Sequence, residues 1–127
     1  MKIYIAHSKD INYKEELYQT IRTDDSINKH DIILPHEIND KSNNDRNFYK
    51  TIDLVIAECS KPSTGMGIEL GWLYDDNIPI YCIYKQNSKI STSIYTITNK
   101  IYEYKNKSEL LTIIKKIIDE LESKRNR

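Results

Sequence analysis

The sequence predicts an α/β fold: a single-domain, doubly wound (flavodoxin or Rossmann-like) parallel sheet of five strands with helices on both faces. Five short runs rich in isoleucine, leucine and tyrosine are spaced along the chain, and segments with helical spacing of apolar residues separate them. Strands that alternate with helices are typical of βαβ units and of a parallel sheet. We expect the strands at residues 2–6, 31–34, 53–57, 78–84 and 100–104.

Apolar residues at intervals of three and four predict the helices. One apolar helical face lies within residues 11–22, a short helix follows at 45–51, and a third helix ends at about residue 76. Residues 85–98 are rich in Ser, Thr and Asn and hold at most one short helical turn. Ser108 is the expected N-cap of a closing helix. The wide apolar stripe of that helix consists of Leu110, Leu111, Ile113, Ile114, Ile117, Ile118 and Leu121.

Length, charge and cysteine usage limit the possible classes of protein. The 127 residues suffice for one domain over 1–127, with a basic tail at about 123–127. Lys+Arg and Asp+Glu both number 19, and this zero net charge argues against a nucleic-acid partner. No apolar run is long enough to span a membrane and no signal-peptide pattern is present, so no membrane partner is expected. Cys59 and Cys82 lack metal-ligand spacing, which favours buried thiols in a reducing cytoplasm.

All three glycines of the chain lie between Cys59 and Trp72. This stretch predicts a loop that joins the third strand to a helix, because glycine permits positive φ and lets a ligand approach the backbone. The N–H groups at the start of that helix would point at the carboxyl edge of the sheet. Ser63 and the N–H groups near Gly65 and Gly67 are therefore candidates to hold a 5′-phosphate or 5′-hydroxyl. Ser63 is equally suited to capping the helix alone, and a lone Gly-x-Gly is a weak motif.

The carboxyl edge of the sheet is the expected place for a ligand, because doubly wound sheets bind beyond the ends of their strands. His7 and Ser8 follow the first strand there, and His36 and Glu37 follow the second. Tyr4, on the first strand, is a candidate to stack on a nucleobase. The histidines have no spacing of the His-x-x-x-His kind, so no metal is expected.

Two carboxylates, Glu69 and Asp45, lie near the starts of neighbouring predicted helices. Such a pair suits cleavage of a glycosidic bond, in which one carboxylate is the nucleophile and the other acts as acid or base. A simpler interpretation stays open, in which Glu69 only complements the helix dipole, an effect of roughly 0.3–1 kcal/mol. Asp45 likewise occupies the position of an ordinary helix cap.

Residues 45–71 resemble the core of the nucleoside 2-deoxyribosyltransferase superfamily, most closely the branch that includes 2′-deoxynucleoside 5′-monophosphate N-glycosidases. In that branch an Asp precedes a strand of the type Asp-x-Val-Val-Ala-Glu, and Pro-Ser-x-Gly-x-Gly-x-Glu-Leu-Gly follows. The matching segments here are Asp53-Leu-Val-Ile-Ala-Glu58 and Pro62-Ser-Thr-Gly-Met-Gly-Ile-Glu-Leu-Gly71. More distantly, the glycine stretch resembles that of phosphoribohydrolases that release cytokinin bases.

The resemblance implies roles for particular residues. Glu69 matches the nucleophile that carries the sugar, Asp45 its partner acid, and Ser63 the serine that contacts the 5′-phosphate. Ser93 matches a serine supplied to the neighbouring subunit's site, which implies a homodimer or a larger homo-oligomer. No metal or organic cofactor is implied, and the partner is a small nucleoside or nucleotide. The sequence departs from the family after the first strand, where His7 stands in place of the usual glycine.

The sequence therefore predicts an enzyme that cleaves or transfers the N-glycosidic bond of a (deoxy)nucleoside or its 5′-monophosphate through a covalent glycosyl intermediate on Glu69. Two alternatives stay open. The altered first turn slightly favours a nucleotide-binding or sensing module without turnover. Related folds also carry sites that hydrolyse NAD-type dinucleotides.

Overall fold

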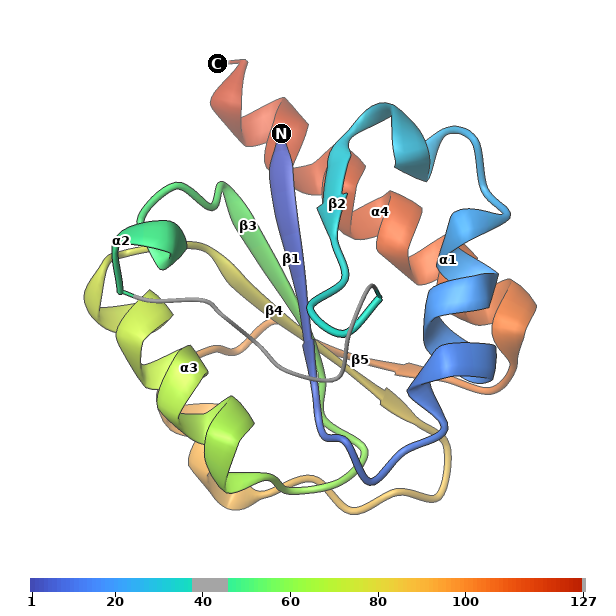
Figure 1. The fold of residues 1–127 in the computed structure, drawn as a ribbon, viewed down its shortest axis with the longest axis horizontal. Coiled ribbons are helices and arrows are strands. Elements are labelled where there is room, and N and C mark those ends of the chain that lie inside the picture. Colours follow the sequence, from blue (N-terminus) through green and yellow to red (C-terminus); the bar gives the residue numbers. More distant parts are fainter. Residues whose placement is uncertain (38–45, 127) are drawn as a thin grey trace.

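The computed structural model describes residues 1–37 and 46–126. Five strands form one sheet in the order β2-β1-β3-β4-β5, and every neighbouring pair is parallel. The strands are β1 (Lys2–His7), β2 (Asp31–Ile33), β3 (Leu54–Glu58), β4 (Ile80–Lys85) and β5 (Ile101–Tyr104). Figure 1 shows this twisted sheet with helices on both sides. The predicted fold class is confirmed.

The sheet is built around β1, which pairs with both β2 and β3. Its register places Tyr4 opposite Ile33 on one side and opposite Val55 on the other. The chain moves outward from β1 to β2 and then returns past β1 to form β3. The strand order thus reverses between β1 and β3, and ligands of doubly wound sheets bind beyond the carboxyl ends of the strands at such a reversal.

Helices cover both faces of the sheet (Figure 1). One face carries η1 (Lys14–Tyr18), a turn of π-helix that continues into α1 (Gln19–Arg22), together with the long α4 (Lys107–Arg125). The opposite face carries α2 (Arg46–Tyr49), α3 (Thr64–Asp75) and the 3-10 turn η3 (Thr92–Thr96). A second 3-10 turn, η2 (Ile27–Lys29), leads into β2.

Alternation along β1 divides its side chains between two hydrophobic cores. Ile3 and Ile5 pack with residues of α1 and α4, whereas Tyr4 and Ala6 pack with residues of α2 and α3. All residues of β3 are buried, because helices cover both faces of a parallel sheet. Tyr4 consequently lies on the same side of the sheet as Glu69.

The stretch at residues 59–72 differs from the prediction. α3 begins at Thr64, so all three glycines lie inside the helix and none of them has a positive φ. The connecting loop is only residues 59–63. The helix starts this early because Ser63 caps it, with its Oγ accepting a hydrogen bond from the N–H of Met66 at 3.3 Å. Elsewhere the strand boundaries lie within two residues of those predicted, and the first helix begins at Lys14 instead of residue 11.

The closing helix begins at a different cap from the one predicted. Asn106, and not Ser108, is the N-cap, and its side-chain oxygen accepts a hydrogen bond from the N–H of Glu109 at 2.9 Å. The carboxylate of Glu109 accepts the N–H of Lys105 at 3.1 Å, which makes a close variant of a capping box. The predicted apolar stripe packs inward, with Leu110, Ile114, Ile117, Ile118 and Leu121 buried.

We predict that Asn106→Ala lowers the free energy of unfolding by about 1 kcal/mol, because the N–H of Glu109 loses its partner. The matched control is Ser108→Ala at an exposed position of the first turn, which should leave stability unchanged or slightly higher, since alanine is the better helix former. Urea denaturation followed by circular dichroism measures both. A larger loss in Ser108→Ala than in Asn106→Ala would contradict the observed cap.

Candidate active site

A cavity of about 500 Å³ opens at the carboxyl edge of the sheet, beside the reversal between β1 and β3. Its walls come from β1 and the turn after it, the turn after β2, α2, and α3 with its cap. The lining residues are Tyr4, His7, Ser8, Lys9, Asp10, Pro35, His36, Tyr49, Ser63, Gly65, Met66, Ile68, Glu69 and Trp72. Most of the candidates from the sequence are among them.

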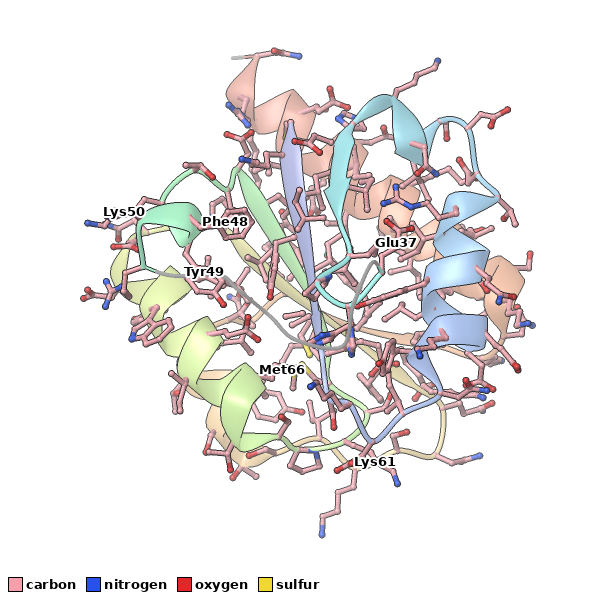
Figure 2. All side chains as sticks on the ribbon, in the orientation of Figure 1. Glu37, Phe48, Tyr49, Lys50, Lys61 and Met66 are labelled. Atoms are coloured by element: carbon pink, nitrogen blue, oxygen red, sulfur yellow. The ribbon has the colours of Figure 1, made fainter. Side chains whose placement is uncertain are left out.

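Glu69 lies in the second turn of α3, and its half-buried side chain lines the cavity. The Oε2 atom accepts hydrogen bonds from the hydroxyl groups of Tyr4 and Tyr49, the latter at 2.5 Å. Within residues 1–37 and 46–126, no group donates a hydrogen bond to the Oε1 atom. Figure 2 shows Tyr49 extending from α2 into the space between α3 and β1. One carboxylate oxygen is thus anchored, and no described residue donates to the other, which lines the cavity with it.

Tyr4 is fully buried, and its ring packs edge-on against Tyr49 and Phe48. The expectation that Tyr4 stacks on a nucleobase is therefore wrong, because aromatic neighbours already cover the ring. Burial raises the pKa of Tyr4 far above its usual value, and the neighbouring Glu69 carboxylate raises it further. The phenol consequently keeps its proton and acts as a hydrogen-bond donor to Glu69.

His7 forms a buried part of the cavity wall as a neutral imidazole. Its Nδ1 donates to the carbonyl oxygen of Ser8 at 2.9 Å, which leaves Nε2 to accept from the hydroxyl of Tyr18 at 2.6 Å. The Tyr18 oxygen in turn accepts the backbone N–H of His36 at 3.0 Å. Burial lowers the pKa of His7 to about 4, despite the opposing effect of the Ser8 carbonyl. Both ring nitrogens are engaged, so His7 shapes the cavity and does not exchange protons with a ligand.

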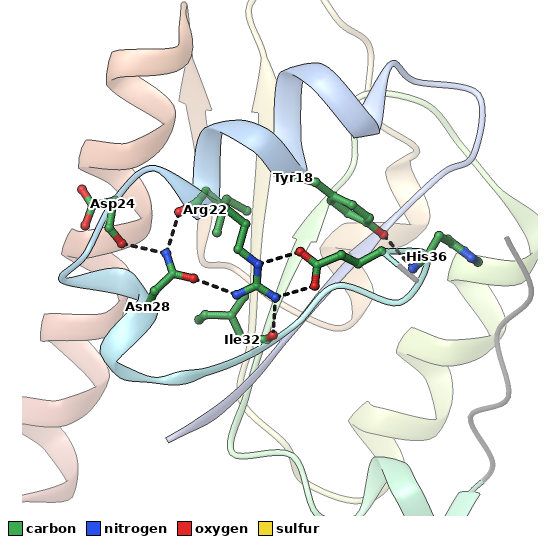
Figure 3. A network of polar contacts seen from close by, with 8 residues as sticks. Tyr18, Arg22, Asp24, Asn28, Ile32 and His36 are labelled. Carbon is green, nitrogen blue, oxygen red and sulfur yellow. Dashed lines mark hydrogen bonds and ion pairs between the residues drawn. The ribbon is translucent and has the colours of Figure 1, made fainter. Parts of the chain in front are cut away.

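A charged network holds the turn after β2, which carries His36 to the cavity (Figure 3). Arg22 on α1 donates two hydrogen bonds to the Glu37 carboxylate, at 2.7 and 2.8 Å. The same guanidinium donates to the side chain of Asn28 at 2.7 Å and to the carbonyl oxygen of Ile32 at 3.1 Å. The hydrogen bonds from Arg22 lower the pKa of Glu37. Glu37 is therefore engaged by Arg22 outside the cavity, and its effect on the site is to hold the neighbouring His36 in place.

The N-terminus of α3 lies between this cavity and a second one of about 380 Å³. Ser63 lines both cavities, and the N–H groups of Thr64 and Gly65 have no carbonyl partner within the helix. Of the N–H groups near Gly65 and Gly67, that of Gly67 itself is engaged within the helix, since it donates to the carbonyl oxygen of Ser63 at 3.0 Å. Gly67 instead lines the second cavity, where an added Cβ would meet nothing within 4 Å.

Besides Gly67, two candidates are not among the described residues that line the main cavity. Ser93, on η3, lines the second cavity near Ser63, and Asp45 lies outside the described residues. Tyr49 and Trp72 line the main cavity although the sequence did not single them out as site residues. The sequence held a signal for Tyr49, because it follows the candidate Asp45 by four residues within the helix predicted at 45–51.

In the described part of the chain, no three His, Cys, Asp or Glu side chains gather closely enough to hold a metal ion. Among the same residues, no helix has the length and apolar character needed to cross a bilayer. Cys59 and Cys82 are both buried and free, as the sequence predicted.

Fold and cavity together define the class: a doubly wound α/β domain with a carboxylate held at the switch point of its sheet. No family model matches the chain. Over 79 residues, 60% of this chain, it is 33% identical to a protein of Syntrophotalea carbinolica named "putative 2′-deoxynucleoside 5′-phosphate N-hydrolase 1". The chain matches 56% of that relative's length, so it spans only a little more than half of it.

A solved structure shows the same fold over nearly the whole chain. The CMP N-glycosidase BcmB of Clostridium botulinum matches with a TM-score of 0.60 and 21% identity, covering 91% of this chain and 99% of that one. The names of both similar proteins agree with the resemblance that residues 45–71 carry.

We predict that the protein loses stability as the pH falls from 6.5 toward 4. In this window the unfolded chain protonates His7 at its ordinary pKa of 6.5, whereas the folded protein keeps it neutral down to about 4. Once the pH has fallen to about 4, this difference in the pKa of His7 lowers the free energy of unfolding by about 3 kcal/mol. His7→Gln should flatten the dependence of the urea midpoint on pH. Equal slopes for wild type and His7→Gln would contradict a neutral, buried His7.

Proposed function

We propose that this protein cleaves the N-glycosidic bond of a nucleoside 5′-monophosphate, with Glu69 as the nucleophile. The observation that carries the proposal is the Glu69 carboxylate, which lines a ligand-sized cavity with Oε2 anchored by two phenols and Oε1 available. The names of the two similar proteins support it, because a 2′-deoxynucleoside 5′-phosphate and CMP are both nucleoside 5′-monophosphates.

The proposed reaction has two halves. Oε1 of Glu69 attacks the anomeric carbon, the C1′–N bond breaks, and its electron pair leaves with the base. Asp45 is our candidate to protonate the departing base, on the basis of the family pattern. Water then attacks C1′, which releases the 5-phosphosugar, the Glu69 carboxylate and a proton. In a transferase reaction a second base takes the place of this water.

The start of α3 supports a substrate with a 5′-phosphate. Ser63 and the first-turn N–H groups of Thr64 and Gly65 lie at the positive end of the helix dipole, a favourable place for an anion. Lys9 lines the same cavity and adds a positive charge. Glu69 lies about one turn further along the helix, so a single rigid element carries the anion-binding end and the reactive carboxylate.

We predict that wild-type protein releases free base from CMP or from a deoxynucleoside 5′-monophosphate. Glu69→Ala should lower this rate by on the order of 10³-fold or more, because the nucleophile is lost. The control is Glu103→Gln, which changes an exposed glutamate on β5 and should retain the wild-type rate. Chromatography measures the base, and mass spectrometry of acid-quenched enzyme detects the phosphosugar on Glu69.

Other outcomes of the same experiment separate the rival functions. A nucleotide that raises the melting temperature of wild type without release of base would favour a sensing module. Release of nicotinamide from NAD would favour an NAD-type nucleosidase. Equal base release by wild type and Glu69→Ala would exclude Glu69 as the nucleophile.

We also propose that the active form is a homodimer or a larger homo-oligomer in which Ser93 enters the site of a neighbouring subunit. The family pattern supports this role. The position of Ser93 also supports this role. Ser93 lines the second cavity and does not line the cavity that contains Glu69 of its own chain.

We predict that Glu69→Ala and Ser93→Ala proteins, each weakly active alone, regain base release when their subunits are mixed. A mixed dimer contains one site with an intact Glu69 and a partner with an intact Ser93. The control is the Glu69→Ala, Ser93→Ala double variant mixed with Ser93→Ala, which should regain nothing. If subunits exchange, as native mass spectrometry would record, and activity stays low, Ser93 does not act across an interface.

A further inference from the structure

Two phenols from different elements converge on one oxygen of Glu69. Tyr4 reaches Oε2 from β1, and Tyr49 reaches the same atom at 2.5 Å from α2. Tyr49 is only 2% exposed, and its ring packs against Tyr4 and Trp72 with centroid distances of 5.7 Å in both cases. The aromatic packing therefore holds the Tyr49 hydroxyl in place independently of the hydrogen bond.

The double contact distinguishes the two carboxylate oxygens. An oxygen that accepts two hydrogen bonds has its lone pairs engaged and is the poorer nucleophile, so attack on a sugar falls to Oε1. When Oε1 bonds to C1′, the negative charge leaves the carboxylate and Oε2 becomes the carbonyl oxygen of an ester. Hydrogen bonds to a charged acceptor are roughly twice as strong as those to a neutral one, so both phenol contacts weaken at this stage.

The second half of the reaction reverses this change. As water attacks C1′, the Oε1–C1′ bond breaks and its electron pair returns to the carboxylate, while the water proton passes to solvent. The charge reappears partly on Oε2, and the hydrogen bonds from the phenols strengthen in the transition state. Interactions that are stronger in a transition state than before it accelerate that step. The phenols therefore favour breakdown of the glycosyl–enzyme over its formation.

We propose that Tyr49 is a positioning residue that selects Oε1 as the attacking atom and accelerates release of the sugar from Glu69. This role rests on the proposed function of Glu69 and adds to it a residue on α2, a short helix that shares the site with β1 and α3. Its hydroxyl acts through the carboxylate, in parallel with that of Tyr4.

The test is Tyr49→Phe, which removes one oxygen and keeps the packed ring. Rapid-quench measurement of free base should show a burst approaching one base per active site, followed by a steady rate about ten-fold below that of wild type. KM should fall together with kcat, because the glycosyl–enzyme accumulates, and mass spectrometry should detect that species. Tyr74→Phe, at an exposed tyrosine of α3, is the matched control and should behave as wild type.

The outcomes separate the two proposals. If wild type releases no base from any nucleotide, the proposed function fails. If wild type is active and Tyr49→Phe turns over at the wild-type rate, or slows with KM unchanged and no burst, the role of Tyr49 is overturned while that of Glu69 stands. The burst amplitude counts competent sites, so a partly unfolded preparation does not imitate the expected result.

Discussion

The hydrogen bond from Tyr4 to Glu69 ties the central strand of the sheet to the helix that packs over it. The two residues are 65 positions apart in the sequence. α3 buries Met66, Leu70 and Leu73 on this face of the sheet, and apolar packing of this kind has little directional preference. The hydrogen bond gives the packing of α3 a preferred orientation, because it forms only when the Glu69 carboxylate lies next to the Tyr4 hydroxyl. Placement of Glu69 in the cavity depends on this contact.

A second carboxylate at the same edge, that of Glu58, is also satisfied internally, and this fixes the loop that follows it. Glu58, the last residue of β3, is 2% exposed and accepts hydrogen bonds from the N–H of Ser60 at 2.6 Å, from the hydroxyl of Ser60 at 2.9 Å, and from Tyr104. The Ser60 hydroxyl oxygen accepts the N–H of Lys85 at 2.8 Å. The short loop before α3 is thereby fixed to β4 and β5, and the start of the helix is fixed with it.

Local patterns in the sequence predicted the fold well, because the spacing of apolar residues within each segment indicates whether that segment forms a strand or a helix. One error concerned two nearby residues that can each cap the same helix. Asn106 and Ser108 are both good caps, and in the structure Asn106 has this role. The glycines pointed to a loop, yet the cap at Ser63 and the buried side chains of α3 extend the helix through all of them. Tyr49 was not predicted as a site residue, because its place in the site depends on a hydrogen bond to Glu69, twenty positions away in the sequence.

The sequence by itself determined the doubly wound fold and the candidacy of Glu69, because periodicity and a motif within residues 45–71 are local properties of the chain. Only the tertiary structure decided which oxygen of Glu69 is anchored, that Tyr4 donates a hydrogen bond instead of stacking, and that His7 is neutral. These properties come from burial and from side chains that meet across β1, α1, α2 and α3. Their distances and dielectric surroundings exist only once the sheet has brought those elements together.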